Sequence, residues 1–537
     1  MNTPNSLAGK KAILLACPWK LFDTSREPEE TWRLEPQGRS RAMPEWRERI
    51  TLKRMLAAFD VGLLVFAFGA ARSLCAQEIS YDVVITNGRV MDPESGLDAV
   101  RNVGISRGKI RAIGSAALKG KQTIDARGLV VAPGFIDLHQ HGQDEENYRA
   151  KARDGVTTAL ELEVGVADID RWYAERQDKA LINYGASVGH IAVRMVVMHD
   201  PGQLLPSGDA AHREATPEAI EQIMSLLEKG LRRGALAVGV GPAYTEAATN
   251  REITEVFRVA ARHHASCHVH IRSGAPRTGG SPGNFTGFEE AVAAAAITGA
   301  PLHIVHIQST GGPDVVYELQ MISEARSHGL DVTTEAYPYT MGMTSIQSAI
   351  FDHQENEPDS YFASLLWPAT GEHLTRDLFL RYRKQGGMII LPSNTQENID
   401  AAIENPLTMI ASDGHLLNGK GHPRTAGTYA RVLGYYVREK KALDLMTALK
   451  KMTLMPAERL EKRAPAFKDK GRIRVGADAD ITVFDPGTVI DKATYEKPLE
   501  YSEGIPFVLV RGVPVVKDGA LVEGVFPGQG VRAPASQ

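Results

Sequence analysis

The sequence predicts an α/β fold: a parallel barrel of alternating strands and helices, with a small β domain built from both ends of the chain. Between residues 133 and 465, short apolar runs alternate with amphipathic helical stretches, the order expected of a parallel barrel. Short segments typical of β-strands precede and follow this body. Histidines and acids follow several of the predicted barrel strands, whose carboxyl ends meet on one face of a barrel.

The composition is that of an ordinary globular protein, with 43% hydrophobic and 23% charged residues. A length of 537 residues accommodates a barrel and an accessory domain. The net charge of −4 argues against a nucleic-acid or membrane-surface partner. The three cysteines form no paired framework, so we expect no structural disulfide.

Residues 1–78 are expected to form a leader outside the fold. Residues 1–54 are polar and lack periodicity, and an apolar run over 55–71 follows Lys53 and Arg54. A basic flank, a short apolar core and small residues after it are typical of a secretory signal peptide, and the core is short for a membrane span. Asp60 inside the run is atypical of such a signal.

A signal peptide belongs at the start of a chain, so we expect translation to begin near Met43, with residues 1–42 as an upstream extension. The protein would then be periplasmic or secreted, without stable membrane insertion. The alternative is a cytoplasmic protein in which residues 55–71 form a buried or membrane-apposed helix.

Two clusters of predicted strands, at 79–132 and 466–530, are expected to form one small β domain. The first cluster begins with an alternating segment over 81–86, and Asn87-Gly88 after it is a turn signal. Segments that alternate in the same way at the other end of the chain are 480–486 and 507–516.

The barrel elements alternate in order along the chain. Thr216 is the N-cap of a predicted helix, Pro217 opens its first turn, and apolar positions keep helical spacing up to Gly234. A strand over 235–240 follows, and residues 340–398 are expected to form loops and helices over the pocket. Further helix–strand pairs are predicted at 251–264 and 267–271, 288–298 and 302–307, and 315–328 and 330–335.

An apolar run that starts at Val130 ends in His139 and His141. Residues i and i+2 of a strand point to the same side, so both imidazoles face one direction, as metal ligands do. His270, His306 and Asp413 stand at the ends of later strands. Zinc binds imidazole and carboxylate, so these five residues together predict a zinc site. A structural role, as a hydrogen-bonded core residue or as a helix cap, is favoured for five other histidines: His263, His264, His268, His303 and His328.

The second barrel strand, over 159–165, carries Glu161 and Glu163 on the same side, toward the barrel interior. A buried carboxylate is costly without a partner and is tolerated when it binds a metal. Glu163, nearer the carboxyl end of the strand, is the preferred bridging ligand, and Glu161 is its neighbour or its substitute. The alternative is that buried Lys or Arg side chains pair with both carboxylates.

The run Pro-Gly-Phe-Ile-Asp-x-His-x-His at 133–141 resembles the first-strand signature of the amidohydrolase superfamily, metal-dependent hydrolases on (β/α)8 barrels. Other segments resemble those of N-acyl-D-amino-acid deacylases (D-aminoacylases), most specifically the run from Ser412 through Arg424 to Glu439. The others are Val-Gly-His-x-x-x-Arg at 188–194, His-Ile-Arg at 270–272 and Glu-Ala-Tyr-Pro-Tyr at 335–339, where the family has Asp first. The resemblance covers about residues 80–525.

The resemblance implies a TIM-like (β/α)8 barrel over 133–465 and a composite β-sandwich from 79–132 and 466–530. It implies one or two zinc ions, and a bridging carboxylate favours a binuclear site. Asp413 would act as general base and then general acid, and His190 would hydrogen-bond the carbonyl oxygen of the substrate. The metal ligands would be His139, His141, Glu163, His270, His306 and Asp413.

Two positions depart from the family. Where D-aminoacylases place a metal-binding Cys on the second strand, this chain has Val164, and where they often have Lys shortly after the His that matches His306, it has Gln308. If that Lys holds the substrate carboxylate, the candidates for this role here are Arg424, Arg272 and Tyr244. Guanidinium binds carboxylate through two hydrogen bonds, so Arg424 is preferred, and a structural salt bridge is its alternative role.

We therefore expect an enzyme that hydrolyses an amide bond of a small molecule, foremost of an N-acyl-D-amino acid, by a metal-activated hydroxide. The alternative enzyme is a dipeptidase or a hydrolase of another amide or cyclic amide. The alternative of another class is a non-catalytic barrel kept for binding, which would be expected to lack ligands or Asp413. A homo-oligomer is compatible with the sequence.

Amino-terminal sequencing of the natively exported protein tests the leader. Cleavage after the small residues that end at Ala76 is expected to give a mature chain that begins near Gln77. A mature chain that retains residues 1–54 contradicts the prediction.

Overall fold

The computed structural model describes residues 80–272 and 284–535. The chain divides into compact units over 1–76 and 77–537, and all described residues belong to the second. The predicted leader and its signal peptide lie outside the described residues. No helix in the described ranges is long and apolar enough to cross a membrane.

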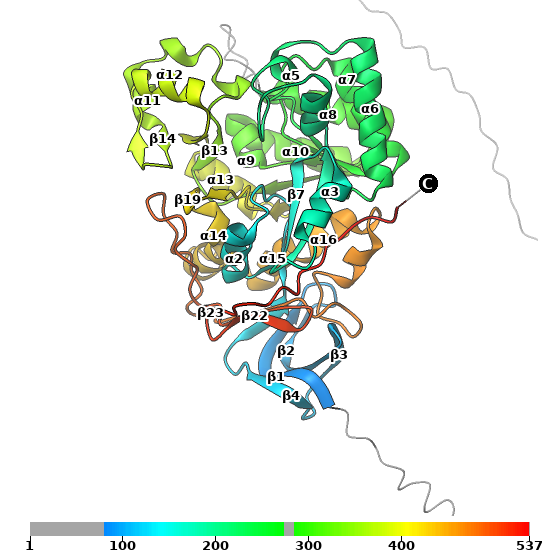
Figure 1. Cartoon of the computed structure of the whole chain (residues 1–537). Coiled ribbons are helices and arrows are strands. Elements are labelled where there is room, and N and C mark those ends of the chain that lie inside the picture. The colour runs from blue at the N-terminus through cyan, green and yellow to red at the C-terminus, as the bar shows by residue number, and fades with distance from the viewer. Residues whose placement is uncertain (1–79, 273–283, 536–537) are drawn as a thin grey trace, which may run out of the picture. The chain divides into compact units, whose positions relative to one another are not determined.

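Eight parallel strands form a barrel, which confirms the predicted (β/α)8 fold (Figure 1). They are hydrogen-bonded in chain order: β6 (Phe135–Asp137), β7 (Val156–Val166), β8 (Asn183–Gly189), β9 (Ala237–Val240), β10 (Ser266–Val269), β11 (Leu302–Ile304), β12 (Val332–Ala336) and β17 (Thr408–Ile410). The first strand is linked to the segment that follows the last strand, where the backbone N–H of Ser412 donates to Asp137 Oδ1 at 3.0 Å.

Helices follow the strands and cover the outside of the barrel (Figure 1). The predicted start of α6 is confirmed, because Thr216 Oγ1 accepts from the N–H of Ala219 at 3.2 Å and Pro217 opens the helix. The principal helices are α2 (Glu145–Arg153), α3 (Ile169–Arg176), α4 (His190–Val197), α6 (Pro217–Arg232), α7 (Asn250–Arg262), α8 (Asn284–Thr298), α10 (Val315–Ser327), α13 (Gln396–Glu404), α14 (Arg424–Arg431), α15 (Leu445–Met452) and α16 (Leu454–Glu461).

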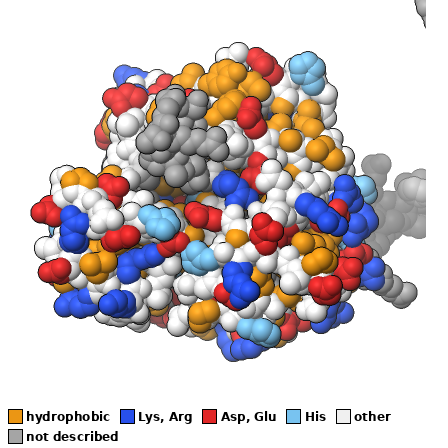
Figure 2. Space-filling model, turned by 90° about the horizontal axis from the view of Figure 1, so that it is seen from above, with side chains coloured by type: hydrophobic (Ala, Val, Ile, Leu, Met, Phe, Trp, Pro, Cys, Tyr) orange, Lys and Arg blue, Asp and Glu red, His pale blue; other side chains and the backbone are white. Residues whose placement is uncertain are grey.

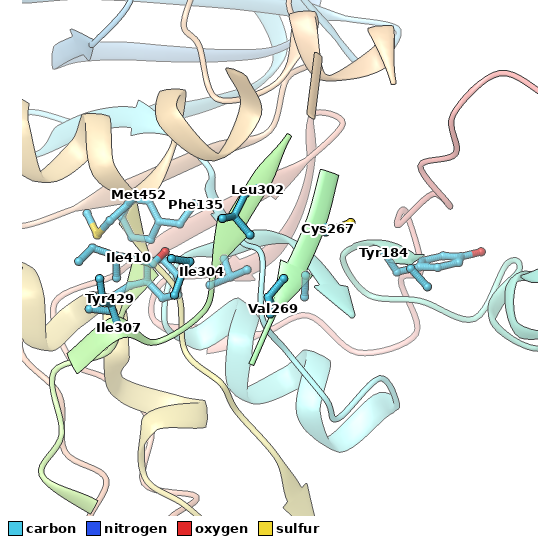
Figure 3. Close-up of a cluster of buried hydrophobic side chains, with 14 of the residues drawn as sticks. Phe135, Tyr184, Cys267, Val269, Leu302, Ile304, Ile307, Ile410, Tyr429 and Met452 are labelled. Carbon is cyan, nitrogen blue, oxygen red and sulfur yellow. The ribbon is translucent and has the colours of Figure 1, made fainter. Parts of the chain in front are cut away.

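The main hydrophobic core lies between the strands and these helices. Figure 3 shows Cys267 and Val269 projecting from β10, and Leu302 and Ile304 from β11, into this layer. All four side chains are buried. Because neighbouring residues of a strand point to opposite sides, the residues between them face the barrel interior.

Both ends of the described chain contribute to one nine-stranded sheet, which confirms the predicted composite β domain (Figure 1). The two contributions join where β5 pairs antiparallel with β20. The strands are β1 (Ser80–Asp92), β2 (Leu97–Ser106), β3 (Lys109–Gly114), β4 (Lys119–Asp125), β5 (Val130–Pro133), β20 (Ile481–Phe484), β21 (Phe507–Val510), β22 (Val513–Lys517) and β23 (Ala520–Leu521).

The turn predicted at Asn87-Gly88 is wrong, because β1 continues through these residues. Asn87 has a φ of 61°, and the pairing of β1 with β2 shifts register between Ile85 and Gly88. The two residues therefore form a β-bulge, which uses the same left-handed conformation that a turn would use. Partners on both sides of β1 keep the strand extended beyond the bulge.

The segment predicted to form loops and helices also contains a small sheet. Its strands are β13 (Met341–Ser345), β14 (Leu366–Trp367), β15 (Glu372–His373) and β16 (Met388–Pro392), with α11 (Asp359–Ser364) and α12 (Arg376–Gln385) beside them. Two of these strands have only two residues each, too few to produce a periodic pattern in the sequence. The segment has its own apolar core, in which Trp367 stacks on Tyr382 with ring centroids 4.1 Å apart.

Phe135 joins the barrel to the composite domain, so its truncation is expected to destabilise the protein. Its buried ring stacks on Tyr429 at 5.5 Å and lies 6.5 Å from Phe484 of β20. Phe135→Ala should lower the free energy of unfolding in urea by about 3–5 kcal/mol. Val100→Ala, at a site 62% exposed, is the control and should change it by less than about 0.5 kcal/mol. Equal effects of the two variants contradict the assignment.

Candidate metal centre

The six predicted ligands lie at the carboxyl-terminal side of five barrel strands. Glu163 is in β7, and the others follow strands: His139 and His141 follow β6, His270 follows β10, His306 follows β11, and Asp413 follows β17. Five of the six are buried, and His141 is partly exposed. The parallel barrel therefore brings together residues that are up to 274 positions apart in the sequence.

The nitrogen and oxygen atoms of these side chains converge on one another. His139 Nε2 lies 3.2 Å from His141 Nε2, 3.0 Å from Glu163 Oε2 and 3.5 Å from Asp413 Oδ1. His141 Nε2 lies 3.1 Å from Glu163 Oε2 and 3.2 Å from Asp413 Oδ1. Three overlapping sets have potential ligand atoms within 4.8 Å of one another: His139–His141–Glu163, His139–His306–Asp413 and Glu163–His270–His306.

Glu163 lies between two pairs of histidines. Its Oε2 faces His139 and His141, whereas its Oε1 lies 2.6 Å from His270 Nδ1 and 3.5 Å from His306 Nε2. One carboxylate oxygen thus faces each pair, the arrangement that a bridging ligand needs.

Glu161 takes a different place from Glu163. Its Oε2 lies 2.8 Å from His141 Nδ1, and its Oε1 accepts from the backbone N–H groups of Val164 and Gly165. Glu161 therefore contacts the candidate ligand His141 through the ring nitrogen that does not face the cluster. Neither glutamate pairs with Lys or Arg among the described residues, contrary to the alternative weighed from the sequence.

The charges of the cluster fit a cation. Burial alone would lower the pKa of His139, but Asp413, Glu163 and Glu335 together raise it well above its usual range. Burial would raise the pKa of Asp413, yet Arg424 and His139 hold it below its usual range. A buried set of imidazoles and carboxylates is the donor set of zinc and similar ions.

Arg424 lies directly beside the cluster. Its guanidinium is fully buried, its Nη2 lies 2.9 Å from Asp413 Oδ2, and it stacks 4.4 Å above the ring of Tyr337. Its Nε and Nη1 have no hydrogen-bond partner among the described residues. The salt bridge considered from the sequence is therefore present, and two donor groups remain available.

Tyr244 also lies beside the cluster, with its ring 4.6 Å from that of His270 and its hydroxyl 3.4 Å from Thr344 Oγ1. Burial and the charge of Glu163 raise the pKa of this phenol well above its usual range, so it is a neutral donor. Its position is consistent with the predicted contact to substrate.

Two other predicted residues have partners outside the cluster. His190 Nε2 lies 2.8 Å from Glu252, which also pairs with Arg194. Arg272 donates from Nε to Glu290 at 3.0 Å and from its other nitrogens to two backbone carbonyls. All three nitrogens of Arg272 are thus engaged away from the cluster, and its expected contact with substrate stays a prediction. The Nδ1 atom of His190 has no partner among the described residues, so its contact to a carbonyl stays a prediction.

Sequence reasoning assigned no role to two groups that support the cluster. Glu335 at the end of β12 lies 2.6 Å from His139 Nδ1, and its place at a strand end was the available signal. Lys151 on α2 is fully buried and pairs with Asp137 at 2.9 Å, and Asp137 in turn accepts from Ser412. No periodic pattern separates such a lysine from the exposed lysines of a helix.

A cavity of about 480 Å³ lies between the segment of small strands and the loop after α4. His415, two residues after Asp413, lines it, and burial lowers the pKa of this imidazole to about 4. The other lining residues are Pro201, Gly202, Gln203, Leu204, Leu205, Ser207, Ser345, Gln347, Gln385, Gly386, Gly387, Met388 and Leu417. Figure 2 shows acidic and basic side chains intermixed on the face that lies above the barrel.

Comparisons with known proteins agree with this site. Residues 130–515 match the amidohydrolase family. D-aminoacylase of Alcaligenes xylosoxydans xylosoxydans is 28% identical over 487 residues, which cover 82% of this chain and 95% of the relative. The structure of an N-acyl-D-glutamate deacylase from Bordetella bronchiseptica, complexed with zinc and a phosphonate inhibitor, has a TM-score of 0.71 at 27% identity and covers 85% of this chain and 100% of that one. A D-aminoacylase structure concerned with a binuclear metal centre has a TM-score of 0.70 at 25% identity, over 84% of this chain and 100% of that one.

A (β/α)8 barrel that gathers four imidazoles and two carboxylates at its strand ends defines the class of metal-dependent hydrolases. The chain belongs to the amidohydrolase family, and its resemblance to D-aminoacylases is confirmed. It is a metal-binding hydrolase that acts on amide C–N bonds.

Metal binding is expected to strengthen as the pH rises. Without an ion, the neighbouring carboxylates raise the pKa of His139 and of His141 above the usual range of imidazole, which favours their protonated forms. A metal ion binds only the neutral imidazole, so these protons must leave. Zinc affinity should therefore rise by roughly tenfold or more per pH unit near neutrality, measured by competition with a chelator calibrated at each pH. An affinity independent of pH contradicts this expectation.

Proposed function

We propose that the protein deacylates N-acyl-D-amino acids with zinc ions held in a binuclear site. The observation that carries the proposal is the position of Glu163, with one oxygen toward each histidine pair. Relatives named D-aminoacylase and N-acyl-D-glutamate deacylase support the choice of substrate class.

Two sets of residues would hold the ions. His139, His141 and Asp413 would hold one ion, His270 and His306 would hold the other, and Glu163 would bridge them. When bound, such ions lower the pKa of a coordinated water and polarise the scissile carbonyl. The barrel would contribute a largely buried site in which the candidate ligand atoms face one another.

Asp413 would carry the proton. The guanidinium of Arg424, 2.9 Å away, keeps this carboxyl ionised, so it can accept the proton released by the attacking water. As the C–N bond breaks, Asp413 returns that proton to the nitrogen, because an amine leaves only when protonated. The same group thus serves as base and then as acid.

Arg424 would bind the carboxylate of the substrate. Its Nε and Nη1 are buried without partners among the described residues, and a carboxylate would satisfy both. With Gln308 where D-aminoacylases often have Lys, Arg424 is the candidate cation that contacts the cluster directly, 2.9 Å from Asp413. Tyr244 would donate a further hydrogen bond.

Asp413→Asn tests the proton-transfer role. The amide keeps the shape of the side chain but accepts no proton, so kcat should fall by roughly 10²–10⁴-fold while metal content changes little. Metal is measured by elemental analysis of the purified variant, and Glu163→Ala, which should lose metal, is the comparison. Normal turnover by Asp413→Asn refutes the assignment.

A substrate panel tests the function itself. The values of kcat/KM for N-acetyl-D-amino acids should exceed those for the L-isomers, for dipeptides and for cyclic amides. A preference for dipeptides or cyclic amides would instead support the alternative enzymes. Purified protein without bound metal and without activity on any of these would favour a binding protein.

A further inference from the structure

A row of buried polar side chains, linked by hydrogen bonds, runs from His139 into the interior of the barrel. His139 Nδ1 lies 2.6 Å from Glu335 Oε1, and the other oxygen of Glu335 lies 3.0 Å from His303 Nε2. His303 Nδ1 lies 2.8 Å from Thr333 Oγ1, which also accepts from Arg459 at 3.4 Å. His139, Glu335 and His303 are each at most 1% exposed.

The alternation of side chains along β11 explains why His303 belongs to this row. Leu302 and Ile304 project outward from β11 into the core (Figure 3), so His303 between them faces the barrel interior. Glu335 stands on the neighbouring strand β12 and reaches both histidines.

The distances in this row favour one arrangement of protons when His139 binds a metal through Nε2. His139 donates from Nδ1 to Glu335, which leaves Nε2 bare and directed at Glu163 and Asp413. Neutral His303 donates from Nε2 to the other oxygen of Glu335 and accepts at Nδ1 from the Thr333 hydroxyl, which lies closer to Nδ1, at 2.8 Å, than to the carbonyl of Leu302, at 3.4 Å. Every carboxylate oxygen of Glu335 therefore has a donor, and the carboxylate cannot turn away from His139 without losing one.

We propose that Glu335 and His303 are positioning residues, which together fix the ring orientation and tautomer of the metal ligand His139. His303 touches no other predicted ligand by a hydrogen bond within the described residues, so it acts through Glu335. The inference rests on the proposed role of His139 in the metal centre. Partners that orient a ligating histidine typically change metal affinity by about 10–100-fold.

The barrel provides a matched control in His268. It is buried like His303, and the centroids of the two rings are 4.5 Å apart. His268 Nε2 lies 3.1 Å from Ser266 Oγ, and among the described residues it has no hydrogen bond to Glu335. A substitution at either histidine changes the packing of the same layer of the barrel. Only a substitution of His303, however, breaks the row of hydrogen bonds that leads to His139.

The experiment measures the zinc dissociation constant by chelator competition, together with the thermal midpoint of the metal-free protein. His303→Leu is expected to weaken zinc binding by about 10–100-fold, and His268→Leu by less than about threefold, with similar thermal midpoints. His303→Gln, whose amide N–H can still donate to Glu335, should restore most of the affinity. Glu335→Gln, which keeps the size but removes the charge, should weaken binding by at least about tenfold.

Several results would overturn the proposal: wild-type affinity in His303→Leu, equal losses in the two Leu variants, or no recovery in His303→Gln. If the Leu variants do not fold, Glu335→Gln decides, and wild-type affinity there overturns it. A wild-type protein that binds no zinc refutes the proposed metal centre, which is distinguishable from variants that bind as well as the wild type.

Discussion

The charge of Glu163, held almost completely out of water, is the constraint on which the site depends. Its side chain is 2% exposed, and its partners within the described residues are imidazoles from three other strand ends. Removing a carboxylate from water is costly unless opposite charge surrounds it. The barrel meets this cost by curving its eight strands around the site, which brings histidines to both oxygens.

The backbone is strained at two of the candidate ligands. His306 and Asp413 have φ values of 31° and 52°, in the left-handed region that side chains with a Cβ seldom adopt. His306 is held by the short helix that starts after it, and Asp413 is flanked by Ser412, which donates to Asp137. Strain of this kind persists where the surroundings fix the backbone, and here it turns both side chains toward the cluster.

The composite domain holds the opposite end of the barrel. Thr482 of β20 donates to the carbonyl of Gly155 at 2.6 Å, just before β7 begins, and Asn183 at the start of β8 donates to Asp480 at 2.9 Å. These contacts fix the amino ends of the strands, while the candidate ligands occupy the carboxyl ends. Anchoring and chemistry are thus separated along the barrel axis, as in other (β/α)8 enzymes.

Local patterns in the sequence determined the alternation of strands and helices, the cap at Thr216 and the strand ends that carry His139, His270 and Asp413. These features depend on residues close in the chain, whose periodicity and capping are visible in one dimension. Local sequence did not determine whether the chain turns back or continues at Asn87-Gly88. A bulge and a turn use the same backbone conformation there, and only the strands that pair with β1 distinguish them.

Only the tertiary structure decided which carboxylate lies between the histidines, and that Arg424 reaches the cluster while Arg272 does not. It also placed Glu335 behind His139, across nearly 200 residues of chain. Such choices depend on where a side chain points after the strands have formed the barrel. The barrel joins residues that are far apart in the sequence, so local periodicity does not predict these contacts.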